Sequence, residues 1–257
     1  VWNGEVGDWQ LDDVSFMSAF TLPGHGNKFD MLQFMYPFER DKRIIFYEGS
    51  HKYTIDGKTA PRSVTGLVHQ FETPFDPKTM VVKMRNGRNW ACKQKEYTHA
   101  SGEIMTNDEI IMKWEKNGEV SSARGTLLHW HCEMFMNGAI IHGPFSTEFG
   151  YFIEFYKRFM LPRGLIPVRT EFSIFHTGLA VAGQIDALYK YYDTDKYVIA
   201  DYKRSKEIKE SNRYQKLLPP FDHLDATNLN TYTLQLLMYR YILKTEYNLE
   251  IDELFLV

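Results

Sequence analysis

Two short apolar segments joined by a polar turn constrain the fold of this chain most strongly. Residues 183–189 read Gly-Gln-Ile-Asp-Ala-Leu-Tyr, residues 197–203 read Tyr-Val-Ile-Ala-Asp-Tyr-Lys, and Asp-Thr-Asp-Lys lies between them at 193–196. Runs of Ile, Val and Tyr favour strands, and an Asp-rich interval favours a turn. The sequence therefore predicts a β-hairpin centred near Thr194 and Asp195.

Charged side chains gather at the open end of this predicted hairpin. With that centre, Asp186 lies opposite Lys203, and Asp201 lies two residues along on the same face. Divalent cations such as Mg²⁺ prefer carboxylate and carbonyl oxygens, so we expect a metal site with the Tyr202 carbonyl as a further ligand. Lys203 would orient or deprotonate an attacking water, or offset charge on a phosphate. The alternative is an ordinary surface Asp–Lys pair, because a one-residue slip would turn the charges to opposite faces.

Two further residues could join this site. His129 lies in a predicted helix and shares a face with Glu133, four residues on, whereas His131 points elsewhere. A neutral imidazole can bind Mg²⁺ or, more readily, Mn²⁺, although a lone helical histidine is more often simply packed or solvated. Glu171, on a predicted strand before the hairpin, would add another acid or would be an exposed strand residue.

The order of predicted elements indicates an α/β fold with a central mixed sheet flanked by helices. Helices are expected from Thr106 to a break at Gly118, and then over 121–136, 147–160 and 228–245. Strands are expected over 168–175, 181–192 and 197–203, with a hairpin at 44–55. We expect an N-terminal accessory region over 1–105, with the hairpin and a basic segment, and a core over 106–257 whose last strand is cut short at the C-terminus. Residues 1–40 show no clear period.

Composition limits the classes of protein that this chain could represent. The 257 residues are 44% hydrophobic and 15% aromatic, which suffices for a packed core. No apolar run approaches the roughly 20 residues that span a bilayer, so no membrane contact is expected. Two cysteines are too few for a disulfide framework or for the four thiolates of an iron–sulfur cluster. We expect an intracellular, reducing compartment, whether cytoplasm, nucleus or mitochondrion.

Basic residues are clustered although the net charge is −3. Residues 78–95 carry six Lys or Arg and no acid, and residues 203–216 carry six against two glutamates. Such local patches suit phosphate contacts, while the alternative is a pair of solvated helical faces. The candidate nucleic-acid contacts are Arg85, Arg88, Trp90, Arg124, Arg204 and Lys206, together with Gln235 and Tyr239, one turn apart on the last predicted helix.

Taken in order, these motifs resemble the RecB-type branch of the PD-(D/E)XK nuclease superfamily. The matching segments are Gly125-Thr126-x-x-His129-x-x-x-Glu133, Glu171, Gly183-x-x-Asp186, Asp201-x-Lys203 and Gln235-x-x-x-Tyr239. The lead-in at 51–65 is similar to that of phage and viral exonucleases, and mitochondrial genome maintenance exonucleases share the layout. Ile185 precedes Asp186 where restriction enzymes carry proline, which fits the RecB-type variant.

The resemblance implies a restriction-endonuclease-like fold and a role for each matching residue. His129, Asp186, Asp201 and the Tyr202 carbonyl would bind one or two Mg²⁺ or Mn²⁺ ions, and Lys203 would be the catalytic lysine. Glu171 would support the metal site or the DNA. Gln235 and Tyr239 would position the strand being cut.

The function expected from this resemblance is hydrolysis of DNA phosphodiester bonds, as an exonuclease on single strands or strand ends. No Gly-x-x-x-x-Gly-Lys motif occurs in the sequence, so any ATP-driven motor would lie on another chain or outside this sequence. A helicase or a replication or repair complex on another chain is the partner expected besides DNA. Two alternatives stay open. One is an RNA endonuclease of the cap-snatching type, and the other is a catalytically inactive nucleic-acid-binding subunit.

Overall fold

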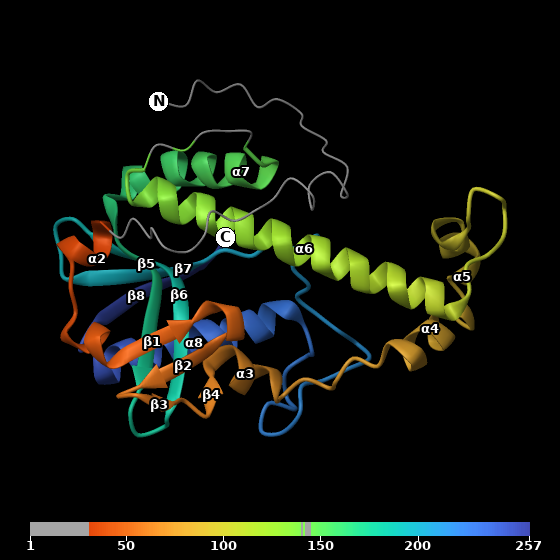
Figure 1. The fold of residues 1–257 in the computed structure, drawn as a ribbon, viewed down its shortest axis with the longest axis horizontal. Coiled ribbons are helices and arrows are strands. Elements are labelled where there is room, and N and C mark those ends of the chain that lie inside the picture. The colour runs from red at the N-terminus through yellow and green to blue at the C-terminus, as the bar shows by residue number, and fades with distance from the viewer. Residues whose placement is uncertain (1–30, 140, 142–144) are drawn as a thin grey trace.

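The computed structural model describes residues 31–139, 141 and 145–257, so the first 30 residues of the predicted accessory region lie outside it. A mixed five-stranded sheet occupies the centre (Figure 1). Strands β5 (Leu165–His176), β6 (Val181–Tyr191) and β7 (Lys196–Asp201) form an antiparallel meander. Strand β8 (Glu250–Leu256) runs parallel to β7, and the short β4 (Arg62–Ser63) runs parallel to β6.

Helices cover both faces of this sheet. On one face, α6 (Asn107–Met136) and α7 (Thr147–Phe155) bury an aromatic-rich core against β6 and β7. On the other face, α3 (Val64–His69) and α8 (Asn228–Glu246) pack against β5, β6 and β7. The protein is therefore a mixed α/β fold with a central mixed sheet flanked by helices, as its order of elements predicts.

The β6–β7 hairpin forms as predicted, but its register differs from the predicted one. Ala187 pairs with Ala200, so continuing the ladder places Asp186 beside Asp201 rather than opposite Lys203. The turn is centred one residue earlier than predicted, because β7 already begins at Lys196, whose backbone N–H donates to Thr194 Oγ1 (3.2 Å). A two-residue change of partner keeps every side chain on its face. The two aspartates therefore become direct neighbours.

A single 30-residue helix, α6, replaces the two helices expected on either side of Gly118. Its start is the predicted one, since Thr106 and Glu109 form a reciprocal capping box. The predicted break was wrong because Gly118 is exposed and a glycine costs only about 1 kcal/mol within a helix. Packing at both ends of α6 outweighs that cost.

Replacing Gly118 with alanine should therefore stabilise the protein. A Cβ at this position would have no atom within 4 Å, so the gain should approach the helix-propensity difference of about 0.5–1 kcal/mol. Urea unfolding followed by circular dichroism would measure it. A loss of stability would show that the helix needs a flexible point at this position.

The helix predicted over 147–160 is α-helical only to Phe155. After α7, the chain makes a π-helical turn at Tyr156–Met160 and a 3-10 turn at Leu161–Arg163. Gly164 then adopts a left-handed conformation with φ of 67° and leads into β5.

The N-terminal residues pack in two different places. A short helix α2 (Met31–Met35) precedes a three-stranded sheet of β1 (Ile44–Tyr47), β2 (Lys52–Ile55) and β3 (Lys58–Thr59), which confirms the predicted hairpin. Ile44 and Tyr53 pack on Phe175 and Ala182 of the central sheet. The short strand β4 and helix α3 also belong to the central layers.

A separate arm projects from the sheet along α6 (Figure 1). We define the arm as α4 (Pro77–Arg85), α5 (Trp90–Lys93), the 3-10 turn Gln94–Tyr97 and the first half of α6. Its own small core includes Val81, Tyr97 and Ile110. Within the described parts of the chain, no helix has both the length and the apolar character needed to cross a bilayer.

Candidate metal and phosphodiester site

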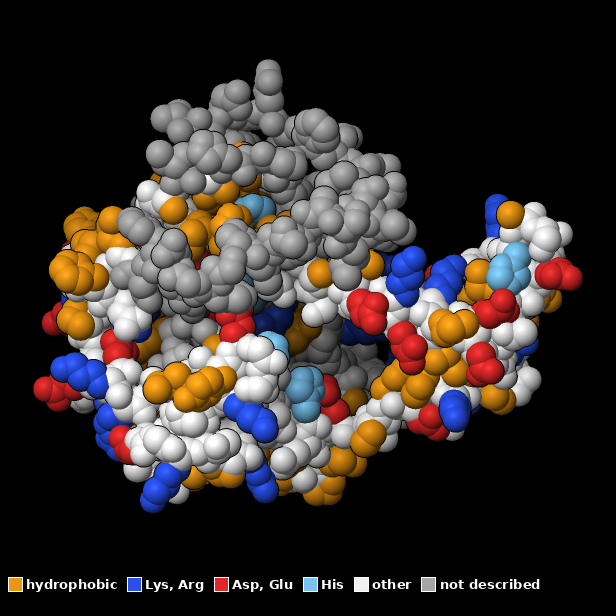
Figure 2. All heavy atoms as spheres, viewed as in Figure 1, with side chains coloured by type: hydrophobic (Ala, Val, Ile, Leu, Met, Phe, Trp, Pro, Cys, Tyr) orange, Lys and Arg blue, Asp and Glu red, His pale blue; other side chains and the backbone are white. Residues whose placement is uncertain are grey.

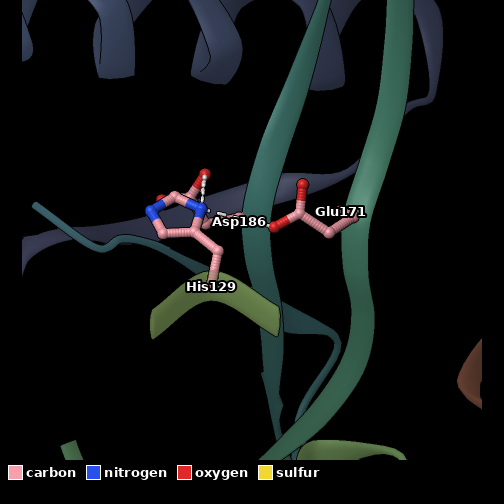
Figure 3. A group of neighbouring side chains, drawn as sticks. All are labelled: His129, Glu171 and Asp186. Atoms are coloured by element: carbon pink, nitrogen blue, oxygen red, sulfur yellow. Dashed lines mark ion pairs between the residues drawn. The ribbon is translucent and has the colours of Figure 1, made fainter. Parts of the chain in front are cut away.

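Three side chains from different elements meet at the middle of the sheet (Figure 3). His129 comes from α6, Glu171 from β5 and Asp186 from β6. One ligand atom from each lies within 4.8 Å of the other two. His129 Nδ1 is 3.4 Å from Glu171 Oε1 and 3.6 Å from Asp186 Oδ1. These separations are longer than ordinary hydrogen bonds.

The end of β7 completes the group. The Tyr202 carbonyl accepts a hydrogen bond from His129 Nε2 at 2.9 Å, and the Tyr202 N–H donates to Asp186 Oδ2 at 2.6 Å. Lys203 Nζ lies 2.7 Å from Asp201 Oδ2. The structure thus brings together all six residues that the sequence assigned to the metal and the chemistry: His129, Glu171, Asp186, Asp201, Tyr202 and Lys203.

The orientation of the His129 ring matters for its chemistry. Because Nε2 donates to the Tyr202 carbonyl, a neutral ring directs the Nδ1 lone pair toward the Glu171 and Asp186 carboxylates. A lone pair facing two carboxylates is stable only with a cation between them, either a proton or a metal ion. A backbone carbonyl that fixes the opposite nitrogen is the usual support of a metal-binding histidine.

Burial and neighbouring charge shift the ionisation of this group. Burial raises the pKa of Asp201 to about 7, with Asp186 adding to the rise. Burial also raises the pKa of Asp186, against the opposing charges of His129 and Lys203. Burial alone would lower the pKa of His129, but Asp186 and Glu171 raise it to about 10. The pKa of Lys203 rises as well, because Asp186 and Asp201 outweigh its burial.

The donor set fits a hard divalent cation. Both carboxylate oxygens of Asp201 are buried, and among the described residues the partner found for them is the Lys203 ammonium, 2.7 Å from Oδ2. Buried carboxylate oxygens are costly unless hydrogen-bond donors or a cation satisfy them. Aspartate and glutamate oxygens together with one imidazole nitrogen form the oxygen-rich set that Mg²⁺ and Mn²⁺ accept.

Manganese should therefore stabilise the folded protein. A ligand at 100 times its Kd adds about 2.7 kcal/mol to the free energy of unfolding, which should raise the Tm by about 5 °C. Differential scanning fluorimetry with MnCl₂ would measure the shift, with Asp201→Asn as the variant that should lose most of it. An unchanged Tm in the wild type would contradict the metal site.

Glu171 reaches the site through an unusual backbone conformation. Thr170 and Phe172 pair regularly with Ala187 and Ile185, but Glu171 between them has φ of +44°. This left-handed region is rare for a residue with a Cβ, and such strain is concentrated at functional sites. The Gln184 side chain donates to the Glu171 carbonyl at 3.1 Å and supports the conformation. Sequence reasoning missed Gln184, because neither its spacing nor its type signals this role.

Gln235 and Tyr239 support the site from behind. The Gln235 amide donates to the Tyr239 hydroxyl at 2.9 Å, and Tyr239 is 2% exposed. A Cβ on Gly183 would lie 2.6 Å from the Tyr239 ring, so the glycine of Gly183-x-x-Asp186 allows α8 to approach β6 closely. The Tyr232 ring of α8, which sequence reasoning also missed, lies 5.4 Å from Lys203 Nζ.

Of the eight predicted nucleic-acid contacts, Gln235 and Tyr239 are buried, and the other six fall into two distant groups. Arg85 and Trp90 belong to the arm, where Trp90 stacks on Tyr97 and the Arg85 guanidinium donates to the Met105 carbonyl and lies over the Trp90 ring. The exposed Arg88 lies in the turn before α5. Trp114 packs with this group and lies 15 positions before His129 on α6, or about 22 Å along the helix.

The surface of the arm is not uniformly basic, because acidic and basic side chains are mixed along it (Figure 2). By contrast, the three other predicted basic contacts, Arg124, Arg204 and Lys206, line a cavity that Lys203 also borders. The structure thus places only the second group next to the site.

Comparison with known proteins found no protein-family model that matches the chain and no curated protein with a significant match. Function is therefore inferred from the geometry of the site.

Proposed function

We propose that this protein is a divalent-metal-dependent nuclease that hydrolyses DNA phosphodiester bonds, acting on single strands or strand ends. The observation that carries the proposal is the pair of buried Asp201 oxygens beside Asp186, with His129 and Glu171 on one side and Lys203 on the other. A mixed sheet whose meander carries the acids, with helices on both faces, also suits the restriction-endonuclease-like core that the sequence motifs imply.

In this proposal, Mg²⁺ or Mn²⁺ would be held by His129 Nδ1, Asp186 and Asp201. The Tyr202 carbonyl, which the sequence suggested as a further ligand, accepts the His129 Nε2 hydrogen bond and orients the imidazole instead. The ion would supply Lewis acidity to the phosphate and lower the pKa of a bound water. Asp186 is fixed for this purpose by the Tyr202 N–H, and His129 by the Tyr202 carbonyl. Glu171 faces the same imidazole nitrogen as Asp186, with Oε1 3.4 Å from His129 Nδ1.

Lys203 would act on the phosphate as a fixed positive charge. Asp186 and Asp201 raise the pKa of its amine, so it stays an ammonium and does not serve as the base in this arrangement. Hydrolysis forms a bond from a water oxygen to phosphorus and breaks the ester bond to the leaving sugar oxygen, with negative charge increasing at the departing oxygen. An ammonium 2.7 Å from Asp201 is placed to offset that charge.

A time course on end-labelled oligonucleotides tests this proposal. Matched single-stranded DNA, double-stranded DNA and RNA would each be incubated with MgCl₂, with MnCl₂ and with EDTA. The proposal requires cleavage of DNA that EDTA abolishes, with stepwise shortening from an end if the enzyme is an exonuclease. Preferential cleavage of RNA would favour the RNA endonuclease, and binding without cleavage would favour an inactive nucleic-acid-binding subunit.

A further inference from the structure

A cavity opens directly beside the proposed site. Its volume is about 890 Å³, and it lies between the second half of α6, the helix α7 and the segment that follows β7. Tyr202 and Lys203 belong both to its wall and to the site. This volume falls in the range of small-molecule pockets, roughly 300–1,000 Å³, and is large enough for a nucleotide.

The floor and the rim of the cavity differ in chemistry. Leu128, Cys132 and Phe152 form a buried apolar floor. Five charged residues also line the cavity. Four are basic, Arg124, Lys203, Arg204 and Lys206, and one is acidic, Glu148. Glu148 Oε1 lies 2.6 Å from Arg204 Nε and forms an ion pair with it. The charged residues that line the cavity are therefore positive in sum. An apolar floor under a cationic rim matches a flat uncharged ring attached to phosphates.

An aromatic side chain stands at the opening. Tyr151 lines the cavity and is nevertheless 71% exposed, in contrast to its buried neighbour Phe152. An exposed tyrosine next to Lys and Arg side chains that can contact phosphate is a common surface on which an unpaired nucleobase stacks. Trp90, the aromatic residue that the sequence favoured for this role, is instead stacked on Tyr97 in the arm.

We propose that this cavity binds one unpaired base of the strand adjacent to the phosphate that is cut, with Tyr151 as its stacking surface. This inference rests on the proposed nuclease function and adds how the enzyme would recognise a single-stranded substrate. In a duplex both faces of a base are stacked and its edge is paired, so only a base in a single strand, or one flipped out of a helix, can enter. The cavity therefore selects single-stranded substrate.

The test compares Tyr151→Ala with Tyr192→Ala. Tyr192 is 74% exposed and follows the opposite end of β6 from the cavity, so it is a matched control for removing an exposed tyrosine ring. The substrates are a labelled single-stranded DNA and copies that each carry one abasic residue at a different position near the cut. Tyr151→Ala should lower kcat/KM on the intact strand about 10-fold, and Tyr192→Ala should leave it unchanged.

The abasic substrates identify the base. At one position, the missing base should cost the wild type about 10-fold, yet cost the Tyr151→Ala enzyme almost nothing further, because ring and base act together. Equal abasic losses in both enzymes at every position, or equal activity of the two tyrosine variants, would overturn the base site alone. If the wild type cleaves nothing, the proposed function fails. Fluorescence anisotropy with the same variants and strands would then decide whether the cavity binds a base.

Discussion

Replacing Asp201 with asparagine should reduce divalent-dependent cleavage by about 10³-fold and leave the protein folded. Asp201 is 1% exposed and its Oδ2 lies 2.7 Å from Lys203 Nζ, so in the proposed site its carboxylate serves the metal and Lys203. The amide is nearly the same size but carries no charge and offers one oxygen. Loss of a metal ligand or of a fixed charge at the reacting phosphate typically removes several kcal/mol of transition-state stabilisation.

Asp201→Asn should still fold, because burial already disfavours the negative charge of the Asp201 carboxylate. Burial raises the pKa of Asp201 to about 7, so a neutral side chain relieves part of a cost that the folded state carries. Asp195→Asn is the matched control, since Asp195 lies in the turn of the same hairpin and binds Lys190 at 98% side-chain exposure. Activity of Asp201→Asn within 10-fold of the control, measured as initial rates at saturating Mn²⁺, would remove Asp201 from the site.

Replacing Gly183 with alanine should lower the free energy of unfolding by about 2–3 kcal/mol. A Cβ there would meet the Tyr239 ring at 2.6 Å and the Val64 side chain at 3.0 Å. Tyr239 cannot move away cheaply, because its ring is buried and its hydroxyl is held by Gln235. Overpacking of this kind in a well-packed core costs about 1–3 kcal/mol. Since Gly183 precedes Asp186 by three residues on β6, activity should fall as well.

A double-mutant cycle would show whether the ring contact is the cause. Tyr239→Ala should itself cost about 3–5 kcal/mol, but in that background Gly183→Ala should cost less than about 1 kcal/mol. Urea unfolding supplies the free energies. Gly118→Ala controls for the general effect of the substitution, as its Cβ meets no atom within 4 Å. An equal penalty for Gly183→Ala in both backgrounds would contradict this account of the glycine.

Local sequence patterns predicted most helices and strands, because neighbouring residues alone favour these elements. The apolar runs of β6 and β7 and the capping box at Thr106 each contain their own signal. The break expected at Gly118 failed because its weak helix propensity competes with packing at both ends of α6, which only the folded chain provides. The hairpin register depended on where the turn begins, and a Thr194 side-chain bond to the Lys196 N–H settles that point.

The residues of the candidate site also differ in whether local sequence pattern could bring them together. Asp186, Asp201 and Lys203 are close in sequence, so strand periodicity alone could bring them near each other. His129 arrives from a long helix and Glu171 through a left-handed backbone, and neither follows from local pattern. The burial of Tyr239, and the separation of Trp90 from the site, depend on how α8 and the arm pack.

A crystal grown or soaked with MnCl₂ gives the most direct test of the metal site on which the proposed function depends. Anomalous diffraction locates manganese independently of any assumption about the side chains. We expect an anomalous peak in contact with Asp186, Asp201 and the His129 Nδ1 atom, and no such peak in Asp201→Asn. Manganese bound elsewhere, or a wild-type site in which Lys203 and a protonated His129 neutralise the acids with no ion present, would contradict this expectation.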